Sequence, residues 1–240
     1  MDSGTSVVQA VEIINLNYNY PDGKQALKGI NFRLARNETI GIIGQNGAGK
    51  TTLLLQLNGI LQGKGNISIM GLPLVSGNLK KIRAKIGLVF QDPDDQLFSS
   101  TVYDDVSFGP VNMELSVEEV NRRTLEALTL VGMENYSARS SHHLSFGEKK
   151  RVSIATVLSM KPEILILDEP TSNLDPRQRR NLIDLLKNIE AAKIIASHDL
   201  EMIKELCPRV VFMNGGAIVT EGETLDILSN AALLENHGLI

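Results

Sequence analysis

One eight-residue stretch constrains this chain more than any other, and it reads Gly44-Gln45-Asn46-Gly47-Ala48-Gly49-Lys50-Thr51. Its spacing, G-x-x-x-x-G-K-T, is that of a phosphate-binding loop. The apolar run 38–43 before it suits a buried strand, and residues 52–57 after it suit a helix. Strand, glycine loop and helix in this order predict a nucleotide-binding α/β fold.

The chemistry of the stretch supports that interpretation. Glycines let the backbone approach a phosphate closely, and the start of the following helix favours an anion. We expect Lys50 to reach the β- and γ-phosphates and Thr51 to hold Mg²⁺. The simpler alternative is a glycine-rich turn with a chance lysine. The loop by itself indicates neither the base of the nucleotide nor the use of its energy.

Composition sets bounds on the rest. The chain has 240 residues, 42% of them hydrophobic and 22% charged, which allows one large α/β domain or a core with a smaller lobe. A net charge of −4 does not favour a nucleic-acid partner. The single cysteine, Cys207, excludes an internal disulfide and is expected to fill a buried helix end.

Neither a secretory signal nor a membrane span is expected. Residues 1–6 are small and polar, without the basic and then apolar order of a signal peptide. No stretch approaches the roughly 20 apolar residues of a transmembrane helix. Any membrane role is therefore predicted to be peripheral.

The pattern along the chain predicts an α/β core with a helical insertion. Strands are expected at 7–20, 26–35, 38–43, 66–70, 86–90, 164–169, 193–197 and in a hairpin over 210–219. A short basic helix is expected at 78–85, and helical spacing dominates from 102 to 158. We predict a core formed by about 7–91 and 160–240, with a helical lobe at about 92–159.

Two acids follow the apolar run 164–167. Asp168 at such a strand end suits a Mg²⁺ ligand, and Glu169 is a candidate base to orient an attacking water. The alternative is that Asp168 caps the next element and Glu169 is a solvated acid. Downstream, Asp175-Pro176 is expected to begin a helix that ends near Glu190.

A second stretch with possible chemistry is Leu144-Ser145-Phe146-Gly147-Glu148. Ser145 and Glu148 have the spacing of a capping box, as do Ser116 and Glu119, so a helix is predicted to start at each serine. A helix N-terminus with a hydroxyl and a glycine can bind an anion. The alternative is a plain cap, although this one lies shortly before the Asp168-Glu169 pair.

Taken together, these motifs resemble the ATP-binding cassette (ABC) transporter family over nearly the whole chain. The phosphate loop matches Walker A, Gln91 the Q-loop, and residues 144–148 the signature. Residues 164–169 match Walker B with its glutamate, 172–175 the D-loop, and His198 the switch histidine. The resemblance implies a P-loop NTPase fold: an ABC-type nucleotide-binding domain with a RecA-like core, an antiparallel β subdomain and an inserted helical subdomain.

The resemblance also implies roles for individual residues. Catalytic roles fall to Glu169, His198 and Gln91, and metal contacts to Thr51, Gln91 and Asp168. Tyr20 would stack on adenine, with Tyr18 as the lesser choice and a core aromatic as the alternative. The other ATP contacts would come from Gly44, Gln45, Asn46, Gly47, Ala48, Gly49, Lys50, Thr51 and Thr52. A second subunit's ATP would be met by Ser145, Phe146, Gly147 and Glu148.

Details of the sequence are similar to the energy-coupling-factor branch, especially its cobalt/nickel importers. These are residues 91–98, 106–110 and 148–151. One departure is Phe146, which replaces the usual first glycine of the signature pair and puts the geometry of the trans contact in doubt. The chain ends soon after the predicted hairpin, so no extended regulatory domain is expected.

The resulting hypothesis is an ATPase with Mg²⁺ as cofactor that works as a head-to-tail dimer with a second ATPase subunit, either as a homodimer or as a heterodimer. It would sit at the cytoplasmic face of the cell membrane, on integral membrane subunits, and drive uptake of cobalt, nickel or a vitamin. The alternative is a soluble ABC ATPase of DNA repair or translation, but neither long heptads nor a second Walker A loop is present. A GTPase is disfavoured because no Asn-Lys-x-Asp motif is found.

Overall fold

The computed structural model describes residues 9–239. They form two compact units. The first comprises the described residues up to Arg83 and those from Glu190 onwards, and the second comprises Ala84–Ile189. The predicted helical lobe at 92–159 lies within the second unit.

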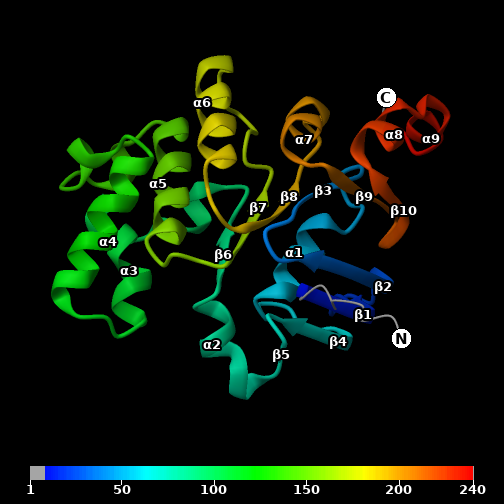
Figure 1. Cartoon of the computed structure of the whole chain (residues 1–240), viewed down its shortest axis with the longest axis horizontal. Helices are drawn as coiled ribbons and strands as arrows, with labels where there is room; N and C mark the ends of the chain where they lie inside the picture. Colours follow the sequence, from blue (N-terminus) through cyan, green and yellow to red (C-terminus); the bar gives the residue numbers. More distant parts are fainter. Residues whose placement is uncertain (1–8, 240) are drawn as a thin grey trace, which may run out of the picture. The chain divides into compact units, whose positions relative to one another are not determined.

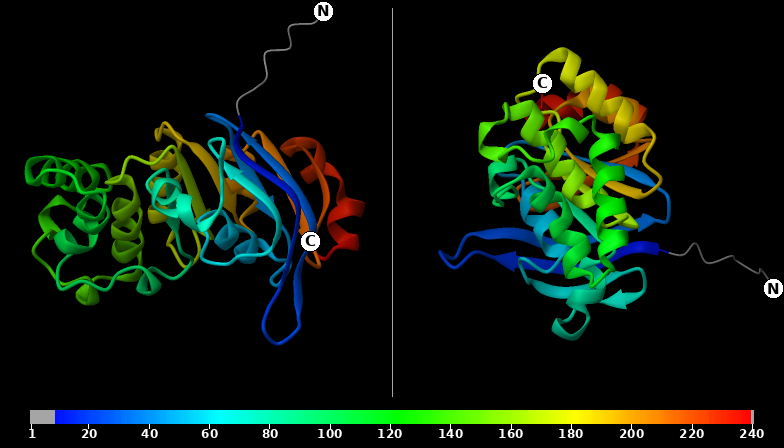
Figure 2. Two further views of the ribbon diagram at one scale, coloured as in Figure 1. Left: turned by 90° about the horizontal axis from the view of Figure 1, so that it is seen from below. Right: turned by 90° about the vertical axis from the view of Figure 1, so that its left-hand side faces the viewer.

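An antiparallel sheet occupies the N-terminal part of the first unit. Its strands are β1 (Gln9–Asn19), β2 (Gln25–Ala35), β4 (Lys64–Ile69) and the two-residue β5 (Leu72–Pro73), in the order β2-β1-β4-β5. Figure 2 shows β1 and β2 as a long hairpin. The strands predicted at 26–35 and 66–70 are confirmed, as is the one at 7–20 except for Val7 and Val8, which lie outside the described residues.

Parallel strands in the same unit carry the phosphate loop. Strand β3 (Thr39–Ile43) lies between β8 (Ala192–Ala196) and β9 (Arg209–Asn214) and is parallel to both. Strand β10 (Ala217–Glu223) completes the predicted hairpin with β9. Every residue of β8 is buried, which explains its nearly unbroken apolar sequence. The helices of this unit are α1 (Lys50–Leu57), α2 (Leu79–Arg83), α7 (Leu200–Leu206), α8 (Thr224–Ser229) and α9 (Ala231–Asn236).

The second unit combines a parallel strand pair with a group of helices. Strand β6 (Ile86–Val89) is parallel to β7 (Ile164–Asp168), and both are fully buried. Helices α3 (Val102–Asn112), α4 (Val117–Leu130) and α5 (Phe146–Leu158) pack against one another (Figure 1). Helix α6 (Pro176–Lys187) follows β7 along the chain. The predicted helical character of 102–158 is therefore confirmed.

The predicted helix starts are found where their caps indicated. Asp175 caps α6 by accepting a hydrogen bond from the Gln178 N–H at 2.8 Å. Ser116 caps α4 in the same way, but its expected capping box is incomplete. The Glu119 carboxylate instead accepts hydrogen bonds from Arg122 and Arg123 on the next turn. A charge-assisted pair with arginine is stronger than a bond to one backbone N–H, which explains the difference.

Two further expectations can be compared with the structure. Cys207 is buried at the end of α7, as predicted. Across residues 9–239 no helix is both long enough and apolar enough to cross a bilayer. Helix α6 ends at Lys187, slightly before the predicted end near Glu190.

Candidate functional site

The phosphate loop joins the end of β3 to the start of α1. Gly44 has φ +153°, and a Cβ atom built on it would lie 2.2 Å from the Met213 carbonyl oxygen. No side chain fits at that distance, so the loop requires glycine there. Gln45, Asn46 and Gly47 are exposed, whereas Ala48 is buried, and Gly49 is the N-cap of α1. The exposed backbone and the helix start together form the cradle that the motif predicts.

Lys50 is buried at the first turn of α1, and its ammonium group turns back over the loop. Its Nζ donates hydrogen bonds to the carbonyl oxygens of Gly44 at 2.7 Å and Gln45 at 3.3 Å. The positive charge is therefore positioned at the cradle before any ligand arrives. Thr51 follows on the same turn and is exposed.

Tyr20 lies beside the same helix. Its hydroxyl is 2.9 Å from Thr52 Oγ1, and its ring meets that of Tyr18 edge-on with centroids 5.1 Å apart. Both rings are half-buried. The structure thus brings Tyr20 and Thr52 together next to the phosphate loop.

His198 follows β8 and is exposed, while the adjacent Asp199 caps α7. Strands β3 and β8 are parallel and in register, with Ile42 opposite Ala196. Carboxyl ends of parallel strands meet at one edge of a sheet, where α/β proteins bind their ligands. His198 and the phosphate loop therefore lie at the same edge of the sheet in the first unit.

The same logic applies to β6 and β7 in the second unit. Val89 is opposite Leu167, so Gln91 and the Asp168-Glu169 pair follow the strands at one common edge. Both carboxyl side chains are buried, and Glu169 has φ +44°, a conformation that non-glycine residues rarely adopt. Its carbonyl oxygen accepts a hydrogen bond from Ser172 Oγ at 2.9 Å. Strained backbone of this kind concentrates at functional sites.

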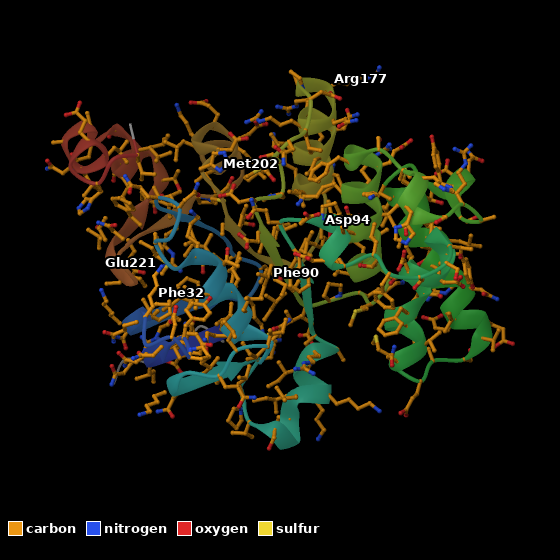
Figure 3. All side chains as sticks on the ribbon, turned by 180° about the vertical axis from the view of Figure 1, so that it is seen from behind. Phe32, Phe90, Asp94, Arg177, Met202 and Glu221 are labelled. Carbon is orange, nitrogen blue, oxygen red and sulfur yellow. The ribbon has the colours of Figure 1, made fainter. Side chains whose placement is uncertain are left out.

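Gln91 itself is exposed and belongs to a segment, residues 90–98, that we call the glutamine loop. Figure 3 labels Phe90 and Asp94, two of its members. The buried Lys150 of α5 donates hydrogen bonds to the carbonyl oxygens of Phe90 at 3.1 Å and Gln91 at 2.7 Å. Burial lowers the pKa of Lys150 to about 8, against the opposing effect of the nearby carboxylates of Asp168, Asp92 and Glu169.

Ser145 caps α5 with the complete capping box that the sequence predicts. Glu148 Oε2 accepts from the Ser145 N–H and hydroxyl, both at 2.8 Å, and Ser145 Oγ accepts from the Glu148 N–H at 3.4 Å. These bonds hold the pKa of Glu148 below its usual range. Ser145 is exposed, Phe146 half-buried and Gly147 buried against the Gln178 side chain.

Each of the two units carries a side chain whose donor chemistry suits magnesium. Among residues 9–239 there is no cluster of three or more His, Cys, Asp or Glu side chains that could hold a metal by itself. Mg²⁺ characteristically takes one or two carboxylates together with substrate phosphates and water. The Asp168 carboxylate and the Thr51 hydroxyl are hard oxygen donors of that type.

Sequence reasoning missed two side chains that organise the glutamine loop, Lys150 and Gln96. The Gln96 side chain joins the Phe90 N–H to the Ser153 carbonyl oxygen. A signal for Lys150 was available, because Gly147, Lys150, Ile154 and Leu158 recur at helical spacing and are all buried. A lysine on the buried face of a helix needs hydrogen-bond acceptors or an acidic partner. The sequence pattern does not show which residues provide them.

Comparison with known proteins identifies the class. The family profile described as "ABC transporter" matches residues 27–172. The chain is 48% identical to the energy-coupling factor transporter ATP-binding protein EcfA of Methanothermobacter thermautotrophicus, over 95% of this chain and 76% of that protein. It is also 48% identical to EcfA of Carboxydothermus hydrogenoformans, over 96% and 86% of the two chains.

Solved structures agree with this assignment. CbiO1 of Clostridium perfringens, part of the ABC transporter complex CbiONQ, has 42% identity and a TM-score of 0.82, covering 96% of this chain and 95% of that one. A dimeric ATP-binding cassette bound to ADP and phosphate has 26% identity and a TM-score of 0.81, with 89% and 98% covered. The chain belongs to the ABC transporter family, has the predicted ABC-type P-loop fold, and is an ATP-binding and ATP-hydrolysing subunit.

Proposed function

We propose that this chain is the ATPase subunit of an energy-coupling-factor importer. The observation that carries the proposal is the 48% identity to EcfA proteins, which extends over at least 95% of the chain. The likeness to CbiO1 favours the cobalt/nickel group, with a vitamin as the other class of solute. The partners are then integral membrane subunits, and the subunit works at the cytoplasmic face of the cell membrane.

The roles of the nucleotide-binding residues follow from their positions. Lys50 and the backbone of the phosphate loop bind the β- and γ-phosphates, and Tyr20 stacks on the adenine. Thr51, Asp168 and Gln91 would hold Mg²⁺, which would supply charge neutralisation at the phosphates. Loop glycines, a buried ammonium and a helix start give electrostatic stabilisation without reorganisation, which is the main source of catalysis in phosphoryl transfer.

Hydrolysis needs a base and a sensor as well. Glu169 orients the attacking water. Its buried carboxylate and its backbone at φ +44° are features that concentrate at functional sites. His198 contacts the γ-phosphate, and Gln91 senses the membrane partner. Ser145, Phe146, Gly147 and Glu148 contact the ATP of a second ATPase subunit in a head-to-tail dimer.

The test is reconstitution. The chain is purified with the membrane subunits that accompany it, inserted into liposomes with ATP inside and out, and assayed for uptake of labelled Ni²⁺, Co²⁺ or a panel of vitamins. We expect ATP-dependent uptake of one of these solutes. Recovery with ribosomes or DNA and without membrane subunits overturns the proposal in favour of a soluble ABC ATPase.

A further inference from the structure

Lys150 is a completely buried lysine to which the proposed roles assign no function. Its exposed fraction is 0%, and it lies in the middle of α5. Lysine is almost never fully buried unless its ammonium group has partners, because removing the charge from water is costly. Its partners therefore indicate why a lysine stands at this position.

Those partners are the backbone of the glutamine loop and the acids around it. The ammonium group donates to the carbonyl oxygens of Phe90 and Gln91, at 3.1 and 2.7 Å. The carboxylates of Asp168, Asp92 and Glu169 act on its charge. Lys150, five residues after the cap of α5 at Ser145, is thus hydrogen-bonded to the backbone of Gln91.

Two further side-chain contacts also connect the glutamine loop to α5. The Gln96 amide donates to the Ser153 carbonyl oxygen at 2.7 Å and to Thr156 Oγ1 at 2.6 Å, both on α5. Lys149 pairs with Asp94 at 2.6 Å; its own side chain is 15% exposed, but the Asp94 side chain is 60% exposed and open to water. Exposed pairs contribute little because water replaces them readily. Lys150 holds the one position in the loop, Gln91, to which a functional role is proposed.

We propose that Lys150 is a positioning residue that fixes Gln91 relative to the helix that presents Ser145 and Gly147. The inference rests on the proposed function, since it deepens the role given there to Gln91. Through Lys150, a movement of the glutamine loop is transmitted to the helix that meets the second subunit's ATP. Loss of the ammonium group therefore slows turnover without weakening nucleotide binding, because the phosphate loop is unchanged.

The experiment compares Lys150→Met with Lys149→Met, the adjacent lysine, whose ammonium group pairs with the exposed Asp94 and makes no contact with the backbone of Gln91 in the described hydrogen bonds, in the complex with its membrane subunits. We expect Lys150→Met to lower kcat by about tenfold or more while KM for ATP changes less than about twofold. Lys149→Met is expected to retain the wild-type kcat. If Lys150→Met fails to fold, Lys150→Gln, which keeps a neutral donor, is measured in the same way.

A double-mutant cycle with Gln91→Ala distinguishes a role of Lys150 in positioning Gln91 from a role in stabilising the fold alone. If Lys150 acts through Gln91, Lys150→Met lowers kcat no further in a Gln91→Ala background. Multiplicative effects of the two changes, or a wild-type kcat in Lys150→Met, overturn the inference. Failure of the proposed function is distinguishable, because the unaltered complex would then lack ATP-dependent uptake altogether.

Discussion

Cys207 shows how burial governs the chemistry of a single residue. Its thiol lies in the core at the end of α7, and burial raises its pKa to about 12, well above the ordinary value of a thiol. Only the thiolate is a nucleophile. At pH 9, we expect iodoacetamide to alkylate the native protein at least about 100-fold more slowly than the urea-unfolded protein. Mass spectrometry of timed samples measures both rates, and rates within about tenfold of each other would contradict the assignment.

The same residue predicts a pH dependence of stability. Between about pH 9 and 12 the unfolded thiol loses its proton while the native thiol keeps it. The unfolded state then binds fewer protons, so the contribution of Cys207 to the free energy of unfolding falls as pH rises through this window. Urea titrations of the wild type and Cys207→Ala should therefore converge between pH 9 and 12. A constant difference would show that the thiol titrates normally.

Glu169 is the residue proposed to orient the attacking water. Its carboxyl group is buried and its backbone is held at φ +44°. Glu169→Gln keeps the shape of the side chain and removes the base. We expect ATP turnover to fall by roughly 10²- to 10⁴-fold while ATP affinity is retained.

The matched control is Glu163→Gln, in the same unit, where the carboxylate forms a partly exposed pair with Lys85. Its turnover should equal that of the wild type, measured by phosphate release at saturating ATP. Normal turnover in Glu169→Gln would remove Glu169 from the role of base.

At the scale of elements, the phosphate loop predicts unequal effects of two glycine substitutions. Gly44 and Gly47 both have positive φ, but a Cβ on Gly44 would meet the Met213 carbonyl oxygen at 2.2 Å, whereas Gly47 has open space. Gly47→Ala incurs only backbone strain, of about 1–3 kcal/mol. Gly44→Ala adds a clash with rigid backbone, so we expect it to cost about 2 kcal/mol more. Urea unfolding tests this, and equal costs would contradict the described geometry.

Local signals predicted most of the elements. The continuous apolar run of β7, the glycine loop before α1 and the caps at Ser145 and Asp175 are each determined by neighbours in sequence, so pattern and structure agree. Strand β5 was missed because two residues, one of them proline, give no periodic signal. The capping box expected at Ser116 does not close because the Glu119 carboxylate pairs with arginines one turn away.

The candidate site was predictable as residue types and not as contacts. The positions of Gly44, Asp168 and His198 at strand ends follow from the motif and the rule for parallel sheets. The attachment of the glutamine loop to α5 joins residues about 60 positions apart, such as Lys150 and Phe90. No periodicity encodes such a contact, because it arises only when β6 and α5 pack in the folded chain.

At the scale of the whole molecule, the proposed active ATPase is a head-to-tail pair in which each ATP meets Lys50 of one subunit and Ser145 of the other. Lys50→Ala removes the buried cation at the phosphate loop, and Ser145→Ala removes the capping hydroxyl at the helix start proposed to meet the partner's nucleotide. Each variant alone should be inactive, since both sites of its dimer carry the same defect.

A mixture of these two variants tests this claim most directly. Half of the dimers in an equimolar mixture pair one variant with the other, and one site of each such dimer has both residues intact. We therefore expect phosphate release at about a quarter of the wild-type rate from two proteins that are inactive alone. A mixture as inactive as its components would contradict the account, because the two residues would then serve the same nucleotide from within one subunit.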